Sequence, residues 1–142
     1  MSSSNVALVK SGSFVANNAA LIAVGRVLLS LIFILAGYAK LTGIAGTAGW
    51  FGSIGLPFPT VVAVLVGLLE LFGGLAILVG FQTRLAAVAL ALFTIAATLI
   101  AHLDFADQVQ LLFFQKNLAI AGGLAVLAAF GAGALSIDSR RG

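Results

Sequence analysis

The sequence predicts an all-α integral membrane protein, a four-helix bundle in which every helix crosses the bilayer. Hydrophobic residues make up 62% of the 142-residue chain and charged residues only 8%. A soluble domain of this size needs more charged residues than this to cover its surface. Lipid must therefore solvate most of the exterior of this protein. Segments rich in Gly and Pro divide the chain into four apolar stretches. Each is close to the ~20 residues that a helix needs to cross the hydrocarbon core.

The four spans are expected at about 20–41, 60–80, 85–102 and 115–135. Helices are the form that satisfies every backbone group within the segment, away from water. The connection after the first span is long enough for a short interfacial helix around 46–53. We expect residues 1–18 to form a polar, poorly ordered leader, 19–138 a single transmembrane domain, and 139–142 a basic tail.

The basic residues in short connections predict that both termini are cytoplasmic. With four spans, Lys10, Arg84, Arg140 and Arg141 all fall on one side of the membrane. Trp50 and other aromatic residues fall near the opposite interface, where an aromatic belt is expected.

Composition also excludes several kinds of chemistry. The chain has no cysteine, which rules out disulfide exchange and thiolate metal sites. Its single histidine, His102, rules out bis-His haem within one chain, and with Asp104 and Asp107 it makes only a faint metal-ligand pattern, so no metal site is expected. The net charge of +3 is spread along the chain without a basic cluster, so no nucleic-acid partner is expected.

Charges within a span are costly, about 2.5–3.5 kcal/mol at the bilayer centre, so Arg26 and Glu70 are expected to face the bundle interior. If Lys40 and Thr60 mark the outer interface, the helical rise places Arg26 about 21 Å and Glu70 about 15 Å below it. An Arg side chain reaches across the remaining ~6 Å. We therefore predict a buried Arg26–Glu70 ion pair that fixes helix register or carries protons. The alternative is that Arg26 extends to the headgroups and Glu70 is protonated.

Four other polar residues project to the outer third of the bundle, and we predict that they line a ligand-binding pocket that opens outward, with Asp104 and Asp107 beside it. They are Lys40, His102, Lys116 and Asn117. The alternative for the two lysines is that they anchor helix ends among the headgroups.

These residues occur in an ordered series of motifs: Arg26-(x)10-Gly37-x-x-Lys40, Gly55-Leu-Pro57, Glu70-x-x-Gly73-Gly74, Gly80-Phe81-x-Thr83-Arg84, His102, Lys116-Asn117 with Gly122-Gly123, and Gly131-x-Gly133-Ala-Leu-Ser-Ile-Asp138. The series runs from about Gly25 to Arg140 and resembles the DoxX family of small membrane proteins. The resemblance implies a four-helix protein of the bacterial inner membrane. It also implies that the polar residues named above form a core of functional or structural importance.

The family takes its name from subunits associated with a terminal quinol oxidase and with thiosulfate:quinone oxidoreduction. Our first hypothesis is therefore a quinone- or lipid-interacting membrane subunit of a redox complex, with no cofactor of its own and a quinone as the expected ligand. The second is a structural or assembly subunit of a membrane complex, or a homo-oligomer, in which the charges set helix register. A small proton-coupled transporter ranks below both, because Glu70 would be neutralised and the pocket is cationic.

Overall fold

The computed structural model describes the backbone of residues 3–141, and the side chains of Ser3 and of residues 18–141. Within this part of the chain all regular structure is helical, which confirms the predicted all-α class. The helices are α1 (Ser3–Thr42), α2 (Ile44–Ser53), α3 (Pro59–Val79), α4 (Thr83–Ala101), α5 (Gln108–Phe130) and α6 (Ile137–Arg141). Four stretches are long and apolar enough to span a membrane: Asn18–Thr42, Pro59–Val79, Thr83–Ala101 and Gln108–Phe130.

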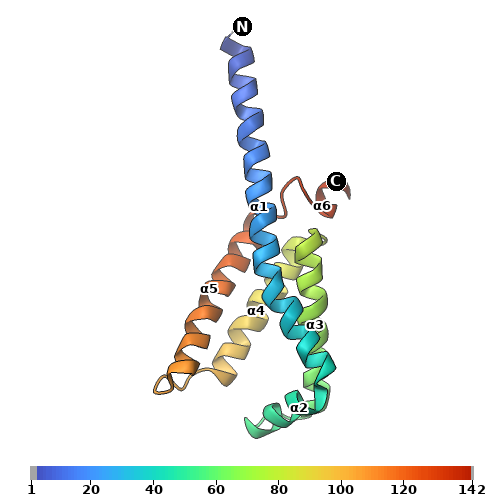
Figure 1. The fold of residues 1–142 in the computed structure, drawn as a ribbon, viewed down its shortest axis with the longest axis vertical. Coiled ribbons are helices and arrows are strands. Elements are labelled where there is room, and N and C mark those ends of the chain that lie inside the picture. Colours follow the sequence, from blue (N-terminus) through green and yellow to red (C-terminus); the bar gives the residue numbers. More distant parts are fainter. Residues whose placement is uncertain (1–2, 142) are drawn as a thin grey trace.

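The four long helices are arranged as two pairs (Figure 1). α1 packs along α3 and α4 packs along α5, while contacts between the pairs are fewer. The short helix predicted after the first span is present as α2, which lies against α3. The start of α1 and helix α6 lie at one end of the molecule, and α2 and the α4–α5 connection lie at the other. Which end faces the cytoplasm stays a prediction.

The first and fourth spans differ in detail from their predicted limits. α1 begins at Ser3, so the backbone of the predicted leader continues the first helix beyond its span, and the division into leader, domain and tail stays a prediction. α5 starts earlier than expected because Asp107 caps it, its carboxylate accepting a hydrogen bond from the amide of Val109 at 2.9 Å. It ends at Phe130 because Gly131 adopts φ 82°, outside the helical region.

The end of the bundle near α6 is closed by the C-terminal segment. The Asp138 carboxylate accepts hydrogen bonds from the backbone amides of Gln82 at 2.7 Å and Thr83 at 2.9 Å, so it caps the start of α4. Burial acts to raise the pKa of Asp138, but these amides and the nearby Arg141 outweigh it and hold the pKa below its ordinary value. The segment after α5 therefore binds the turn between α3 and α4.

Helices α1 and α3 approach each other closely at Gly37. A Cβ atom added at Gly37 would lie 2.8 Å from the carbonyl oxygen of Gly67 and equally close to the Cα of Leu71. Both are backbone atoms that cannot move aside cheaply. Small residues permit this approach in membrane helices, and here it brings Lys40, one turn after Gly37, to the level of Glu70.

We expect the substitution Gly37→Ala to lower the free energy of unfolding by about 1–3 kcal/mol, because the added methyl group forces the two backbones apart. The measurement is the midpoint of thermal unfolding of the purified protein in detergent. Gly25→Ala is the matched control on the same helix, since a Cβ there meets nothing within 4 Å. Equal midpoints for the two variants would show that α1 and α3 are not in this close contact.

Candidate functional site

A cavity of about 700 Å³ lies between the two helix pairs. Most of its wall is apolar, and it communicates with the surface, because Trp50 and Ile100 in its wall are 44% and 57% exposed. Residues of all four long helices, of α2 and of the segments that follow α2 and α4 line it. Its polar lining residues are Lys40, Glu70, Thr94, His102, Gln110, Lys116 and Asn117. An apolar chamber with a few polar groups is the usual form of a small-molecule site.

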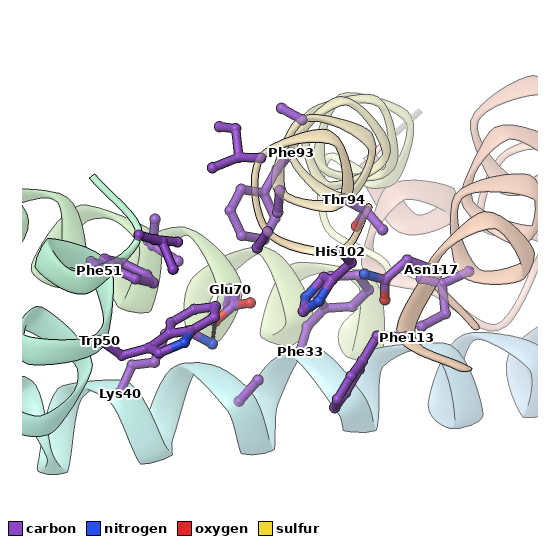
Figure 2. A pocket seen from close by; sticks show the side chains of 18 of the residues that line it. Phe33, Lys40, Trp50, Phe51, Glu70, Phe93, Thr94, His102, Phe113 and Asn117 are labelled. Carbon is purple, nitrogen blue, oxygen red and sulfur yellow. Dashed lines mark ion pairs between the residues drawn. The ribbon is translucent and has the colours of Figure 1, made fainter. Parts of the chain in front are cut away.

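Glu70 forms an ion pair with Lys40 in this cavity (Figure 2). Lys40 Nζ lies 2.8 Å from Glu70 Oε2. The Glu70 side chain is 8% exposed and that of Lys40 is 24% exposed, so the carboxylate is the more deeply buried partner. The pair joins α1 to α3 just beyond their contact at Gly37. A buried carboxylate needs such a partner to remain charged within the bilayer.

The predicted Arg26–Glu70 pair is wrong. Arg26 is only 4% exposed, but its guanidinium donates a hydrogen bond through Nη2 to the backbone carbonyl of Leu135. A Cβ at Gly80 would overlap Nη1 of Arg26, so the guanidinium also packs against the α3–α4 turn. The C-terminal segment returns over this end of the bundle, and no residue pattern in the sequence indicates that return. Arg26 therefore holds that segment and does not line the cavity of Glu70.

Aromatic rings surround His102. Its imidazole is stacked on the ring of Phe113, with centroids 5.0 Å apart and an interplanar angle of 22°, and it lies 6.4 Å from the Trp50 ring at 26°. Lys116 Nζ lies 4.8 Å from the centroid of the Phe113 ring, which is cation–π distance. Trp50 from α2, His102 after α4, and the α5 residues Phe113 and Lys116 thus form one group in the cavity wall. Figure 2 shows the rings of Trp50, His102 and Phe113 in the wall.

A hydrogen bond orients the His102 ring. Its Nδ1 lies 2.6 Å from Oε1 of Gln110. Because an amide oxygen can only accept, Nδ1 is the donor in this contact, and Nε2 is the ring nitrogen left for a ligand. Sequence analysis missed Gln110, because the fourth span was expected to begin only at Gln115. The signal that could have identified Gln110 is its position, two residues after α5 begins at Gln108.

Asn117 joins α5 to α4 as well as lining the cavity. Its Nδ2 donates to Oγ1 of Thr98 at 3.0 Å, and Thr98 in turn donates to the carbonyl of Thr94 at 2.6 Å. The amide nitrogen is thus engaged in helix packing, and its carbonyl oxygen is the atom left for a ligand.

The structure brings all four predicted pocket residues into one cavity and adds Glu70 to them. Their role in ligand binding stays a prediction. Asp104 and Asp107 do not line the cavity. Their carboxylates accept hydrogen bonds from the backbone amides of Ala106 and Val109 in the α4–α5 connection. In the part of the chain that the structure describes, no three metal-binding side chains are clustered.

Four apolar helices around a partly polar cavity define a polytopic membrane protein. The DoxX family model matches residues 21–103, and the chain belongs to this family. It is 47% identical over 115 residues to "Inner membrane protein YqjF" of Escherichia coli (strain K12), covering 81% of this chain and 87% of the relative. It is therefore an inner-membrane protein.

Two further relatives extend the comparison. "Inner membrane protein YphA" of Escherichia coli (strain K12) is 34% identical over 125 residues, which cover 84% of this chain and 89% of YphA. "Putative oxidoreductase CatD" of Bacillus subtilis (strain 168) is 40% identical over 72 residues, about half of each chain, 51% and 52%. No solved structure matches the chain.

A double-mutant cycle tests the ion pair. We expect Lys40→Met and Glu70→Leu each to lower the free energy of unfolding by about 3 kcal/mol, because each leaves the other charge buried alone. The double variant is expected to return close to wild-type stability, because no unpaired charge remains. The readout is denaturation in mixed micelles. The control is Lys116→Met combined with Glu70→Leu, which leaves Lys40 unpaired and should show no recovery; recovery in the control would assign Glu70 to Lys116 instead.

Proposed function

We propose that this protein binds a quinone in the cavity between its helix pairs and serves as the quinone-binding membrane subunit of a redox complex. The observation that carries the proposal is the combination of aromatic rings, hydrogen-bonding groups and a buried carboxylate in one apolar, partly open chamber. A quinone requires an apolar space for its ring and tail, polar groups at its two oxygens, and a source of protons.

Each polar residue has a chemical task in this proposal. Lys116 donates a hydrogen bond to one ring oxygen, and the quinone ring packs against the aromatic side chains of Trp50 and Phe113. The Nε2 atom of His102 exchanges a proton with the second oxygen. The ionised Glu70 carboxylate, paired with Lys40, relays to His102 the two protons that reduction takes up from water. The isoprenoid tail lies along the apolar wall and leaves through the open side.

Reduction of a quinone to a quinol takes two electrons and two protons. The chain has no cysteine and one histidine, so in this proposal the electrons come from a partner subunit that carries a flavin, haem or metal cofactor. The name of the Bacillus subtilis relative CatD includes the word oxidoreductase. That name supports a redox role for this chain, and the E. coli relatives' names support only the location in the inner membrane.

A structural subunit is the second candidate, and a specific observation favours it. The Lys40–Glu70 pair and the Asn117–Thr98 hydrogen bond each join two neighbouring helices, so these polar residues also stabilise the bundle. A role confined to structure predicts a chamber that binds no quinone. The transporter hypothesis is weaker, because the ion pair already neutralises the carboxylate that would have to exchange ions.

Trp50 is the chain's single tryptophan and lines the cavity, which gives a direct assay. We expect a short-tailed ubiquinone or menaquinone analogue to quench Trp50 fluorescence of the protein in nanodiscs in a saturable manner. His102→Leu and Lys116→Gln should each weaken the apparent affinity about 10-fold, which corresponds to the loss of one hydrogen bond to a polar or charged group.

Two controls separate binding in the cavity from partition into lipid. Arg84→Gln alters a residue at the opposite end of the bundle that does not line the cavity, and it should leave the affinity unchanged. An isoprenoid alcohol with the same tail and no ring should not quench. Quenching that rises linearly without saturation, or that is equal in all variants, would favour the purely structural role.

A further inference from the structure

The charges that line the cavity do not sum to zero. The ionisable groups in its wall are Lys40, Glu70, His102 and Lys116. Lys40 and Glu70 neutralise each other across 2.8 Å. Lys116 is thus left as an uncompensated positive charge.

Lys116 has no carboxylate partner among the residues that the structure describes. Its ammonium group contacts the face of Phe113, 4.8 Å from the ring centroid. Asp104 and Asp107, the nearest acidic residues before it in the chain, accept backbone hydrogen bonds within the α4–α5 connection. A cation–π contact supplies only part of a counter-charge, and the exposed Lys116 side chain leaves its ammonium group accessible to an anion.

The position of Lys116 is also unlike that of a lysine that merely anchors a helix end. α5 begins at Gln108, so Lys116 lies more than two turns inside the helix rather than at its start. Its side chain lines the cavity together with Phe113 and Asn117 of the same helix. Lys116 is therefore part of the cavity wall, where a ligand can reach it.

We propose that Lys116 is the counter-ion for a negatively charged oxygen on the ligand, so that the cavity selects amphiphiles with an anionic head. Among quinones, the cavity selects those whose ring carries an ionised hydroxyl group. This part of the inference rests on the function proposed above. A fatty acid has the same combination of an anionic oxygen, here in its carboxylate, and a hydrocarbon chain. In both cases the anionic oxygen lies at Lys116, the head lies beside Phe113 and His102, and the hydrocarbon chain lies along the apolar wall.

A matched pair of quinones tests the selection. A 2-hydroxy-3-alkyl-1,4-naphthoquinone is an anion at neutral pH, because its hydroxyl is a vinylogous carboxylic acid, and its 2-methoxy analogue is neutral. We expect the anion to quench Trp50 with an affinity about 10–100-fold higher than the methyl ether, as for a charge-assisted hydrogen bond. Lys116→Gln should abolish the preference, Lys116→Arg should retain it, and Arg84→Gln should leave it unchanged.

The wild-type comparison needs no variant, so it stands even if a substitution prevents folding. Equal affinities for the two quinones in the wild type would overturn the selection for anions and leave quinone binding intact. A preference that persists in folded Lys116→Gln would likewise overturn the role of Lys116.

A second pair of probes distinguishes this inference from the proposed function. Dibrominated stearic acid quenches tryptophan through its bromine atoms, and dibrominated stearyl alcohol is its neutral match. If neither quinone binds but the carboxylate quenches Trp50 with at least 10-fold higher affinity than the alcohol, the cavity is an anionic-lipid site and the quinone proposal fails. Equal binding of the carboxylate and the alcohol would overturn the selection for anions independently of the quinones.

Discussion

The ion pair between Lys40 and Glu70 is the interaction on which the cavity depends. A charge within a membrane protein must be compensated by the protein itself, because lipid offers it neither water nor counter-ions. The pair meets this constraint by linking α1 and α3, whose backbones already approach closely at Gly37. One wall of the cavity is therefore held at a fixed helix register, with the carboxylate at depth and the lysine nearer its surface.

The second wall of the cavity, formed by α4 and α5, is also held by polar contacts between side chains, but these are weaker than the ion pair. Asn117 joins α5 to α4 through Thr98, and Gln110 orients the His102 ring. The two walls are connected at the opposite end of the bundle, where Arg26 holds the carbonyl of Leu135 and Asp138 caps α4. Fastening the pairs at one end leaves space between them at the other, and that space is the chamber in which we propose that a ligand binds (Figure 1).

The number of spans, the helix after the first span and part of the cavity lining could be predicted from sequence, because apolar runs and rare charges can be read from it directly. The predicted pocket residues that lie in the cavity wall are Lys40, His102, Lys116 and Asn117. The ion-pair partner of Glu70 could not be predicted in this way. Measuring depth along each helix assumed that Lys40 and Thr60 lie level, whereas Lys40 packs beside Gly67, one turn before Glu70. Arg26 was misassigned because its partner is a backbone carbonyl that follows α5, and a carbonyl leaves no signature in a residue pattern. Gln110 was missed because the cap at Asp107 was not recognised as the start of the helix.

The most direct test of this account is the distance between the Glu70 carboxyl carbon and lysine nitrogen in lipid bilayers, measured by solid-state NMR. Glu70 is the single glutamate in the chain, so protein labelled with ¹³C-glutamate and ¹⁵N-lysine reports on this pair without ambiguity at the carboxyl end. The account predicts strong dipolar coupling, as expected for Nζ and Oε2 atoms 2.8 Å apart, that disappears in Lys40→Met and persists in Lys116→Met. Absence of coupling in the wild type, or coupling that appears only when arginine is labelled in place of lysine, would contradict it.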